Sequence, residues 1–403
     1  MGKPEIRFKG YTDEWEQRKL GDWGNFYYGR SCPKWSVTED ATIPCIRYGE
    51  LYTKFGAKID RVYSYTNMPP ENLRFSKGTE VLIPRVGEDP MDYNHCTWLS
   101  MQDVAIGEMI SVFNTDNNPL FTATMFNATL QNEFAMRVEG GSVTNLYFEK
   151  LKNIDVSFPS IPEQEKIAAY FENFDHLITL HQRKCDEVKT LKKYMLQKMF
   201  PQNEQKIPEI RFEGFTEAWE QRKLPEFVSF FNGLTYTPDD VQETGTLVLR
   251  SSNVKNGEIV DADNVYVSDK VATSENVQEG DIIVVVRNGS RALIGKHAQI
   301  KASMPNTVIG AFMSGIRSEH SSFVNALLDT SAFDNEIAKN MGATINQITG
   351  YMFSKMEFMI PSEEEQQRLG AYFSNLDILI TRHQQKCEEL KKIKKFMLQK
   401  MFV

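Results

Sequence analysis

The stretch from Pro162 to Phe200 reads PEQEKIAAYFENFDHLITLHQRKCDEVKTLKKYMLQKMF. We expect one long helix here, because residues suited to one face recur in steps of four and three, with a slip near the end. The early proline, with Glu163 and Glu165, suits a helix start, and the late lysines suit a helix end. One narrow stripe cannot stabilise a lone helix, so this helix needs a partner. The stripe comprises Ile167, Phe171, Phe174, Ile178, His181, Cys185, Val188, Leu191, Met195 and Met199.

The same chain supplies the partner. The stretch from Glu364 to Phe402 repeats the pattern at a shift of 202 (397 − 195), and both copies end in MLQKMF. A second repeat precedes each half: PEIRF and WEQRKL occur within residues 4–20 and again within residues 208–224, at an offset of 204 (208 − 4). A period this long indicates two whole domains. The chain is therefore a tandem duplication.

The two middle regions share a frame of short strands. Apolar, β-branched segments recur at matching places and are bounded by Gly, Pro, Asn and Asp, as strands usually are. Examples are Phe26–Gly29 with Phe230–Gly233, and Gly78–Gly87 with Gly280–Gly289. This pattern predicts a mixed α/β fold with two strand-rich, pseudo-symmetric domains. The predicted segments are 1–160 (first domain), 161–200 (first long helix), 201–207 (linker), 208–360 (second domain) and 361–403 (second long helix).

Composition limits the possible function. No apolar run approaches the ~18 residues of a membrane span, and the N-terminus lacks the apolar core of a signal peptide. Five cysteines without a C-x-x-C pair favour free thiols in the cytoplasm. The middles are acidic, with 12 Lys and Arg against 17 Asp and Glu in residues 21–160, and 10 against 16 in residues 225–361. If the chain binds DNA, a partner must supply much of the phosphate affinity.

Positions shared by the halves are expected to hold the fold, whereas loop positions that differ would distinguish two related targets. Arg, Lys, Asn and Ser are side chains that read base edges. Arg47, Arg85, Arg250 and Arg287 each follow an apolar run at equivalent places, and could bind phosphate or form scaffold ion pairs. The other candidates for DNA binding are Arg30, Lys34, Trp35, Tyr93 and Asn94 in the first half, and Thr235, Tyr236, Asn288, Ser290, Arg291 and Lys296 in the second.

No catalytic motif stands out. Gly289–His297 resembles a phosphate-binding loop, but the glycine spacing is one residue too long and His stands where Ser or Thr is needed. His181 with Cys185, and His383 with Cys387, have helical i, i+4 spacing. They could ligate zinc, but their place on the apolar stripe favours packing. We therefore expect no catalytic residue, metal or cofactor in this chain.

The doubled plan resembles the specificity (S, or HsdS) subunits of type I restriction–modification systems. The openers, the segments CIRYGELYTKFGAKIDRVYSYTN and LRSSNVKNGEIVDADNVYVSD, the runs SKGTEVLIPRVG and EGDIIVVVRNGSRALIGK, and both helices carry the resemblance. It implies two target recognition domains, each reading half of a bipartite double-stranded DNA site. It also implies antiparallel coiled-coil helices that set the spacer and dock two modification (methyltransferase) subunits, with restriction subunits joining them. S-adenosylmethionine, ATP and magnesium would belong to those partners.

Two other interpretations stay open. A single-chain DNA methyltransferase or nuclease would need the catalytic motifs that are missing. A coiled-coil scaffold unrelated to DNA would not explain a constant frame with changing loops. If the helices are antiparallel about a pseudo-two-fold axis, His181 and His383, at equivalent helix midpoints, are expected to face each other.

Overall fold

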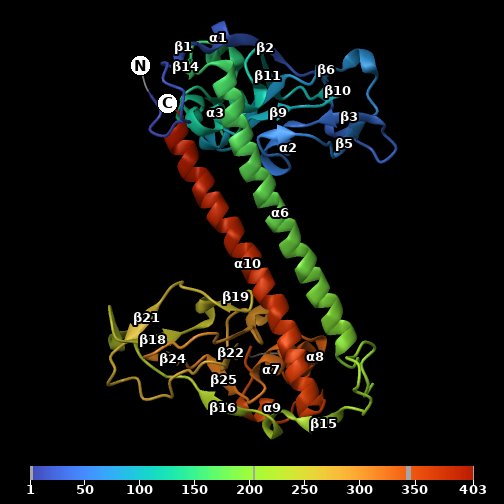
Figure 1. Ribbon diagram of the computed structural model, residues 1–403, viewed down its shortest axis with the longest axis vertical. Coiled ribbons are helices and arrows are strands. Elements are labelled where there is room, and N and C mark those ends of the chain that lie inside the picture. The colour runs from blue at the N-terminus through green and yellow to red at the C-terminus, as the bar shows by residue number, and fades with distance from the viewer. Residues whose placement is uncertain (1–2, 203–204, 342–345, 403) are drawn as a thin grey trace. The chain divides into compact units, whose positions relative to one another are not determined.

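The computed structural model describes residues 3–202, 205–341 and 346–402, and it divides into two compact units (Figure 1). Unit 1 combines Met1–Gln182 with Gln385–Val403, and unit 2 is Arg183–Gln384. The boundary therefore cuts both long helices, whereas the sequence suggested separate domain and helix segments. Asn203 and Glu204, in the predicted linker, lie outside the described residues.

Both predicted long helices are confirmed, as α6 (Ile161–Met199) and α10 (Glu363–Met401). The predicted stripe needs one correction in each helix. Leu191 and its counterpart Ile393 are exposed, while Lys192 and Lys394 occupy the heptad position and are partly buried. With Lys192 included, the steps of four and three run without a slip. Sequence periodicity missed this because a lysine can bury its aliphatic stem and keep its charge paired.

The charged ends of these lysines show how the helices run. In unit 2, Lys192 near the end of α6 contacts Asp377 near the start of α10, at 2.6 Å. In unit 1, Lys394 near the end of α10 pairs with Asp175 near the start of α6. In each unit the end of one helix thus lies against the start of the other, which is the antiparallel arrangement expected from the sequence.

Unit 1 contains sheets in the orders β2-β11-β7-β9-β4, β5-β3-β10-β6, β12-β13-β8 and β1-β14. The strands are β1 (Glu16–Lys19), β2 (Gly24–Tyr28), β3 (Ile43–Ile46), β4 (Lys58–Ile59), β5 (Ser64–Thr66), β6 (Phe75–Lys77), β7 (Glu80–Pro84), β8 (Val86–Gly87), β9 (Thr97–Leu99), β10 (Gln102–Ile106), β11 (Ile110–Thr115), β12 (Glu139–Gly140), β13 (Thr144–Asn145) and β14 (Asp155–Phe158). Its helices besides the long ones are α1 (Leu20–Trp23), α2 (Tyr48–Thr53), α3 (Pro119–Thr129), α4 (Gln131–Ala135) and α5 (Phe148–Leu151).

Unit 2 repeats this plan with the orders β16-β25-β22-β23, β17-β21-β18-β24, β19-β20 and β15-β26. The strands are β15 (Glu220–Lys223), β16 (Ser229–Asn232), β17 (Val241–Gln242), β18 (Thr246–Leu249), β19 (Val254–Lys255), β20 (Glu258–Ile259), β21 (Val265–Val267), β22 (Ile282–Val285), β23 (His297–Gln299), β24 (Thr307–Ile309), β25 (Met313–Arg317) and β26 (Glu357–Ile360). The helices are α7 (Ser321–Leu328), α8 (Ser331–Asn340) and α9 (Gly350–Phe353). The predicted fold class, two strand-rich mixed α/β domains with long helices, is confirmed.

The repeated openers hold the start of each long helix. Arg7 makes a two-pronged ion pair with the buried Glu163, with both N–O distances 2.7 Å. In unit 2, Arg211 grips Glu365 in the same way, also at 2.7 Å. A bidentate pair fixes geometry as well as charge. The opener therefore acts as a clamp on the first turn of the helix in its own unit.

The last residues of each long helix belong to the core of the other half of the sequence. In unit 1, Phe402 packs against Trp15, Phe121 and Phe171, with ring centroids 5.6–6.3 Å apart. In unit 2, Phe200 makes the equivalent contacts with Trp219, Phe323 and Phe373. In Figure 1 the N-terminal opener and the end of α10 lie side by side, since the Ile6 amide donates to the Lys400 carbonyl. The repeated MLQKMF is thus explained by core packing.

Candidate nucleic-acid interface

Four loops of unit 1 meet where β2, β3, β7 and β10 end. The Arg30 amide donates to the Ile106 carbonyl at 2.8 Å, and the Gly107 amide to the Ile46 carbonyl at 2.9 Å. The Arg85 amide reaches the Met109 carbonyl at 3.2 Å. The structure therefore brings together the segments that carry Arg30, Arg47 and Arg85, which are far apart in the sequence.

Unit 2 builds the same junction. The Leu234 amide donates to the Ile309 carbonyl at 2.7 Å, and the Gly310 amide to the Leu249 carbonyl at 2.9 Å. The Arg287 amide reaches the Phe312 carbonyl at 3.2 Å. Thr235, Arg250 and Arg287 thus belong to one junction. We call these two places the unit 1 junction and the unit 2 junction.

Shared glycines make the junctions possible, because two backbones cross there without room for a side chain. A Cβ on Gly29 would lie 2.0 Å from the Gly107 carbonyl oxygen, and one on Gly233 would lie 2.0 Å from the Gly310 oxygen. The frame that the sequence repeats is thus a backbone crossing. The loops that leave the crossing are free to differ.

Arg85 lies at the centre of the unit 1 junction. Its guanidinium lies 4.7 Å from the Tyr28 ring and 5.6 Å from the Tyr147 ring, and its Nη1 donates to the Glu108 carbonyl at 3.3 Å. Burial, and then a hydrogen bond to Glu149, raises the pKa of Tyr28 to about 12, so the ring under Arg85 is neutral. The Nε of Arg85 is buried and has no hydrogen-bond partner among the described residues. Arg85 is therefore held mainly by the two aromatic rings and by one long hydrogen bond.

Its counterpart Arg287 is exposed and lies 5.0 Å from the ring of Phe312, which is itself exposed. The other repeated pair differs between the halves. Arg250 donates to both the carbonyl and the carboxylate of Asp263 at 2.6 Å, so it serves as a scaffold ion pair. Arg47 is half-buried at the start of α2. Of the two alternatives raised by the sequence, the ion pair is observed for Arg250, and phosphate binding stays a prediction.

The loop after Gly29 presents the most open group of the predicted residues. Arg30 and Lys34 are exposed, and Trp35 in the 3₁₀ turn Lys34–Ser36 is 72% exposed. An indole in water is unfavourable, because its apolar surface stays hydrated. A basic loop with a projecting aromatic ring is suited to contacting a nucleic acid.

Tyr93 and Asn94 need correction as predicted ligand-facing residues. Tyr93 is only 1% exposed, and its hydroxyl donates to the Thr144 carbonyl at 2.6 Å, so it is a core residue. Asn94 is half-buried and donates to the Asn127 carbonyl at the end of α3, at 3.1 Å. Sequence reasoning placed both on a loop, and could not foresee that this loop turns inward against α3.

The remaining predicted residues of unit 2 follow two loops. Asn288 is half-buried, and its amide donates to the Ser251 hydroxyl at 3.1 Å, which joins the loop after β22 to the loop after β18. Tyr236 packs partly buried beside Leu234 and Val248. Ser290, Arg291 and Thr235 are exposed, and Lys296 is half-buried. The exposed side chains carry no core role and are available to a ligand.

Sequence reasoning missed a group of aromatic and basic side chains between the end of α2 and β5. Tyr63 and Tyr65 are exposed, and Lys54 and Arg61 lie 5.8 Å and 5.3 Å from the Tyr63 ring. The interleaved aromatic and basic letters of YGELYTKFGAKIDRVYSYT were the available signal. In unit 2, Phe312 and Tyr351 are likewise exposed, and Lys355 lies 4.3 Å from the Tyr351 ring.

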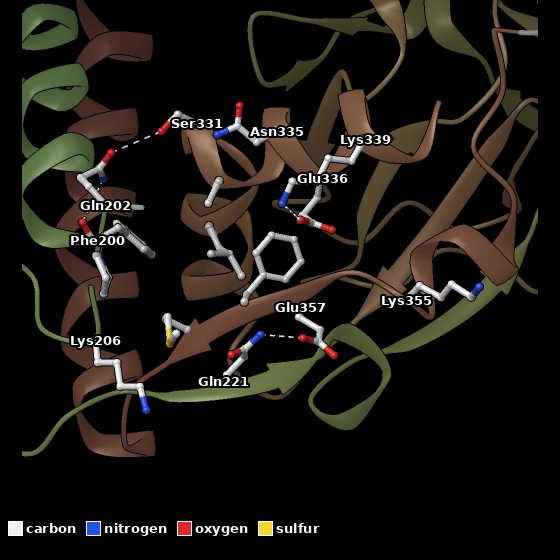
Figure 2. A pocket seen from close by; sticks show the side chains of 15 residues that line it. Phe200, Gln202, Lys206, Gln221, Ser331, Asn335, Glu336, Lys339, Lys355 and Glu357 are labelled. Carbon is white, nitrogen blue, oxygen red and sulfur yellow. Dashed lines mark hydrogen bonds and ion pairs between the residues drawn. The ribbon is translucent and has the colours of Figure 1, made fainter. Parts of the chain in front are cut away.

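The large groove of unit 2 contains none of the predicted residues. It has a volume of about 890 Å³ and lies between α8 and the face of the β15-β26 pair (Figure 2). Its polar side chains are largely paired with one another, as in Gln221 with Glu357 at 2.6 Å and Lys339 with Glu336 at 2.7 Å. A smaller groove of about 500 Å³ contains the equivalent Gln17 in unit 1. Neither groove has a convergent catalytic set.

The suggested zinc ligands do not form a site. Cys185 Sγ lies 3.9 Å from the Ile380 carbonyl oxygen within unit 2, and Cys387 Sγ lies 3.5 Å from that of Ile178 within unit 1. Each thiol packs against the neighbouring helix, as the packing interpretation predicts. No cluster of His, Cys, Asp or Glu suited to a metal occurs among the described residues. His181 and His383 lie in different units, so it remains a prediction that these two side chains face each other.

The chain matches the family model of the type I restriction modification DNA specificity domain twice, at residues 12–190 and at residues 216–392. The chain belongs to this family. The two matched stretches correspond to the two halves of the duplication, each with one junction. The resemblance seen in the sequence is therefore confirmed.

Relatives agree with this assignment. The type I restriction enzyme StySPI specificity subunit of Salmonella potsdam is 25% identical over 195 residues, which cover 45% of this chain and 42% of that protein. The MjaVIII specificity subunit of Methanocaldococcus jannaschii is 22% identical over 275 residues, 64% of each chain. These matches span less than two thirds of the curated relatives.

Among solved structures, the S subunit of a type I restriction-modification system from M. genitalium matches the fold with a TM-score of 0.70 and 14% identity. The match covers 100% of this chain and 99% of that one. No described helix is both long and apolar enough to cross a membrane.

Proposed function

We propose that this chain is the DNA-reading subunit of a type I restriction–modification complex, with unit 1 and unit 2 each reading one half of a bipartite double-stranded site. The repeated junction carries the proposal. One backbone crossing is built twice, and its exposed loops carry Arg30, Lys34 and Trp35 in one unit and Thr235, Arg287 and Arg291 in the other. A constant frame with different polar loops suits two readouts of different sequence.

The chain would work only with partners. Both middle regions are acidic, so phosphate affinity must come largely from bound subunits. The identical EQRK strands β1 and β15 are exposed along their whole length. Unit 1 also exposes Leu177, Ile393 and Phe396 on its helices, and unit 2 exposes Leu379, Leu191 and Tyr194 at positions shifted by 202. Equivalent exposed surfaces on the two halves suit two copies of one modification subunit, with restriction subunits joining the complex.

The chain itself would be non-catalytic. S-adenosylmethionine, ATP and magnesium would bind the partner subunits, and the chain would bind no cofactor. The exposed side chains at the junctions are cationic, aromatic and hydroxyl groups, which suit contacts to phosphates and bases. The role of this chain would be to place a base of the correct sequence at the catalytic site of a partner.

Domain exchange tests this proposal. The chain is co-expressed with its modification subunit, and the methylated motif is mapped by sequencing genomic DNA. Replacing residues 21–160 with the same region of another family member should change one half of the motif and leave the other half intact. Methyl transfer by the purified chain alone, or a change in both halves, would contradict the proposal and favour the single-chain enzyme or the scaffold.

A further inference from the structure

Two cysteines of unit 1 meet beneath the unit 1 junction. Cys32 lies in the exposed loop between Arg30 and Lys34, and Cys45 lies on β3 just before Arg47. They are 5% and 0% exposed, and both belong to one small core cluster with Leu73 and Ala105. Both thiols are free.

The two thiols pack in one core cluster, and their surroundings differ. The neighbouring Cys45 thiol lowers the pKa of Cys32, while the Cys32 thiol and burial raise the pKa of Cys45. Burial, Glu108 and Glu50 oppose the Cys32 thiolate, whereas Arg47 favours it. One sulfur is thus the better nucleophile and its neighbour holds the proton, which is the division of roles in a redox-active dithiol.

The backbone at Cys32 is in an unusual conformation. Ser31 and Cys32 have φ angles of 57° and 80°, in the left-handed region that residues other than glycine rarely adopt. The surrounding hydrogen bonds hold them there, since the Glu108 amide donates to the Ser31 carbonyl at 3.0 Å and the Arg30 amide to Ile106 at 2.8 Å. Strain of this kind persists at sites that switch between conformations.

Unit 2 has no thiol at either place. Tyr236 stands at the position of Cys32 when Gly233 is aligned with Gly29, and Val248 stands at the position of Cys45. Tyr236 and Val248 again share one cluster, so the packing site is repeated. Val248 pairs with Val308 as Cys45 pairs with Ala105, between equivalent parallel strands. The core of unit 2 is packed at this place without a thiol. Packing alone therefore does not explain the two cysteines of unit 1.

We propose that Cys32 and Cys45 form a reversible disulfide with peroxide as the oxidant, and that this modification weakens reading of DNA by unit 1. The Cys32 thiolate attacks hydrogen peroxide, an S–O bond forms, the O–O bond breaks, and hydroxide leaves. The Cys45 sulfur then attacks that sulfenic sulfur, the S–S bond forms, and hydroxide departs with the thiol proton as water. Two sulfurs are oxidised, peroxide is reduced to two waters, and a small dithiol reverses the bond by exchange.

Forming the disulfide would move side chains that are proposed to contact DNA, because they lie close to the two cysteines in the sequence. An S–S bond of ~2.05 Å is shorter than any contact between two unbonded sulfurs, so closing it must draw the loop toward β3. Arg30 and Lys34 lie two residues from Cys32 on either side, and Arg47 lies two residues from Cys45. A base contact depends on close geometry, so a shift of about an ångström is enough to lose it.

The first test reads the bond itself. The full chain is treated with hydrogen peroxide, quenched with catalase, alkylated, digested and analysed by mass spectrometry. We expect a linked peptide pair joining Cys32 to Cys45, which dithiothreitol removes. Cys45→Val, which copies the residue of unit 2, should retain the fold and form no such pair. Full alkylation of both thiols after peroxide would overturn the inference.

The second test reads the consequence, which rests on the proposed function. The complex with its modification subunit is oxidised in the same way and assayed on its mapped site. Methylation should slow by at least about tenfold, the loss expected when one good base contact is removed, and dithiothreitol should restore it. The Cys45→Val complex should keep its rate. Equal losses in both complexes would assign the effect to oxidation of the partner and overturn the regulatory role.

The outcomes separate the two proposals. If the reduced complex methylates no bipartite site, the proposed function fails, although the linked peptide can still be seen. If methylation is normal and the linked peptide forms without any loss of rate, only the regulatory role fails. An internal control uses base substitutions in the half-site that unit 2 is proposed to read. These substitutions should lower the methylation rate by the same factor before and after oxidation.

Discussion

His297 in unit 2 is a buried histidine whose two ring nitrogens both face oxygen acceptors. Its Nδ1 lies 3.0 Å from the Gly295 carbonyl oxygen and its Nε2 lies 3.4 Å from the Asp329 carboxylate. Burial lowers the pKa of His297, but the hydrogen bond and charge of Asp329 outweigh it, and the pKa is raised above 6.5. Lys192, Asp377 and Asp334, from α6, α10 and α8, complete the charged surroundings. Lys192 opposes the histidine cation.

This arrangement predicts a pH dependence of unit 2. Because the folded-state pKa of His297 is raised, its contribution to stability is fully present below about pH 6.5 and is lost as pH rises through the higher folded value. Burial opposes ionisation of Asp329, but His297 and Lys192 prevail and lower its pKa to about 2. Its contribution is therefore present above pH 3.8 and lost as pH falls toward 2.

The measurement is the urea midpoint of unfolding between pH 5.5 and 8.5. The wild-type midpoint should fall as pH rises, and His297→Gln should flatten that slope because it removes the titrating group. His176→Gln, at an exposed position of α6, is the matched control and should leave the slope unchanged. An equal slope in wild type and His297→Gln would contradict the assignment.

A single glycine decides each backbone crossing. Gly29→Ala places a Cβ 2.0 Å from the Gly107 carbonyl oxygen, so the crossing strands must separate. We expect a loss of about 1–3 kcal/mol in the free energy of unfolding, the usual cost of overpacking a rigid site. Gly49→Ala is the control, since nothing lies within 4 Å of its added Cβ. Equal urea midpoints for the two variants would show that the crossing is not rigid.

At the scale of elements, periodicity predicted what depends on neighbours in the sequence. The long helices α6 and α10 were foreseen within two residues at each end, because a heptad stripe is a local pattern. The inward positions of Tyr93 and Asn94 were not foreseen, because they depend on Thr144 in β13 and on α3, far along the chain. The placing of Cys32 and Cys45 in one cluster was missed for the same reason, since the Cys32 loop and β3 meet only through β10.

The sequence also did not predict that the end of each long helix packs in the core of the other half. The repeated MLQKMF marked the end of each helix but not the core that receives it. Phe402 completes the core of unit 1 with Trp15 and Phe171, residues more than two hundred positions earlier. Duplication makes the two possible recipients alike in sequence, so only the folded chain tells which core accepts which end.

This exchange predicts a large effect from a terminal residue. Phe402→Ala should destabilise unit 1 by about 3–5 kcal/mol, because it empties a buried aromatic site. Phe396→Ala, one and a half turns earlier on α10, removes a ring that is 50% exposed and should cost no more than about 0.5 kcal/mol. Differential scanning calorimetry of the full chain would report the two values. Similar losses in both variants would contradict the core role of Phe402.

At the scale of the whole molecule, different residues hold the common fold and form the variable surface. Buried repeated residues such as Trp15 and Trp219 keep the two units alike, while the loops at the junctions differ. Exposed repeated residues have no such structural reason to be alike, so they favour a common partner for both halves. Under the proposed function, the acidic composition is acceptable because bound subunits would supply the charge that holds phosphates.

The last prediction concerns the long helices as a ruler. A helix rises ~1.5 Å per residue, so four residues inserted in α6 after Gln182 and four in α10 after Gln384 add about 6 Å at the boundary between the units. One base pair of DNA occupies ~3.4 Å, so the unread gap between the two half-sites should widen by one or two base pairs. The bases read in each half should not change, because neither junction is altered.

Mapping the methylated motif of the co-expressed complex gives the answer directly. The control is the same four residues inserted between Pro201 and Gln202, outside both helices, which should leave the gap as it was. A four-residue insertion also rotates the apolar stripe by about 40°, because the heptad is interrupted, so a seven-residue pair that keeps the stripe in phase is the second variant. If both insertions fold and methylate at the original gap, the helices do not set the distance between the half-sites, and the spacing must come from the partner subunits.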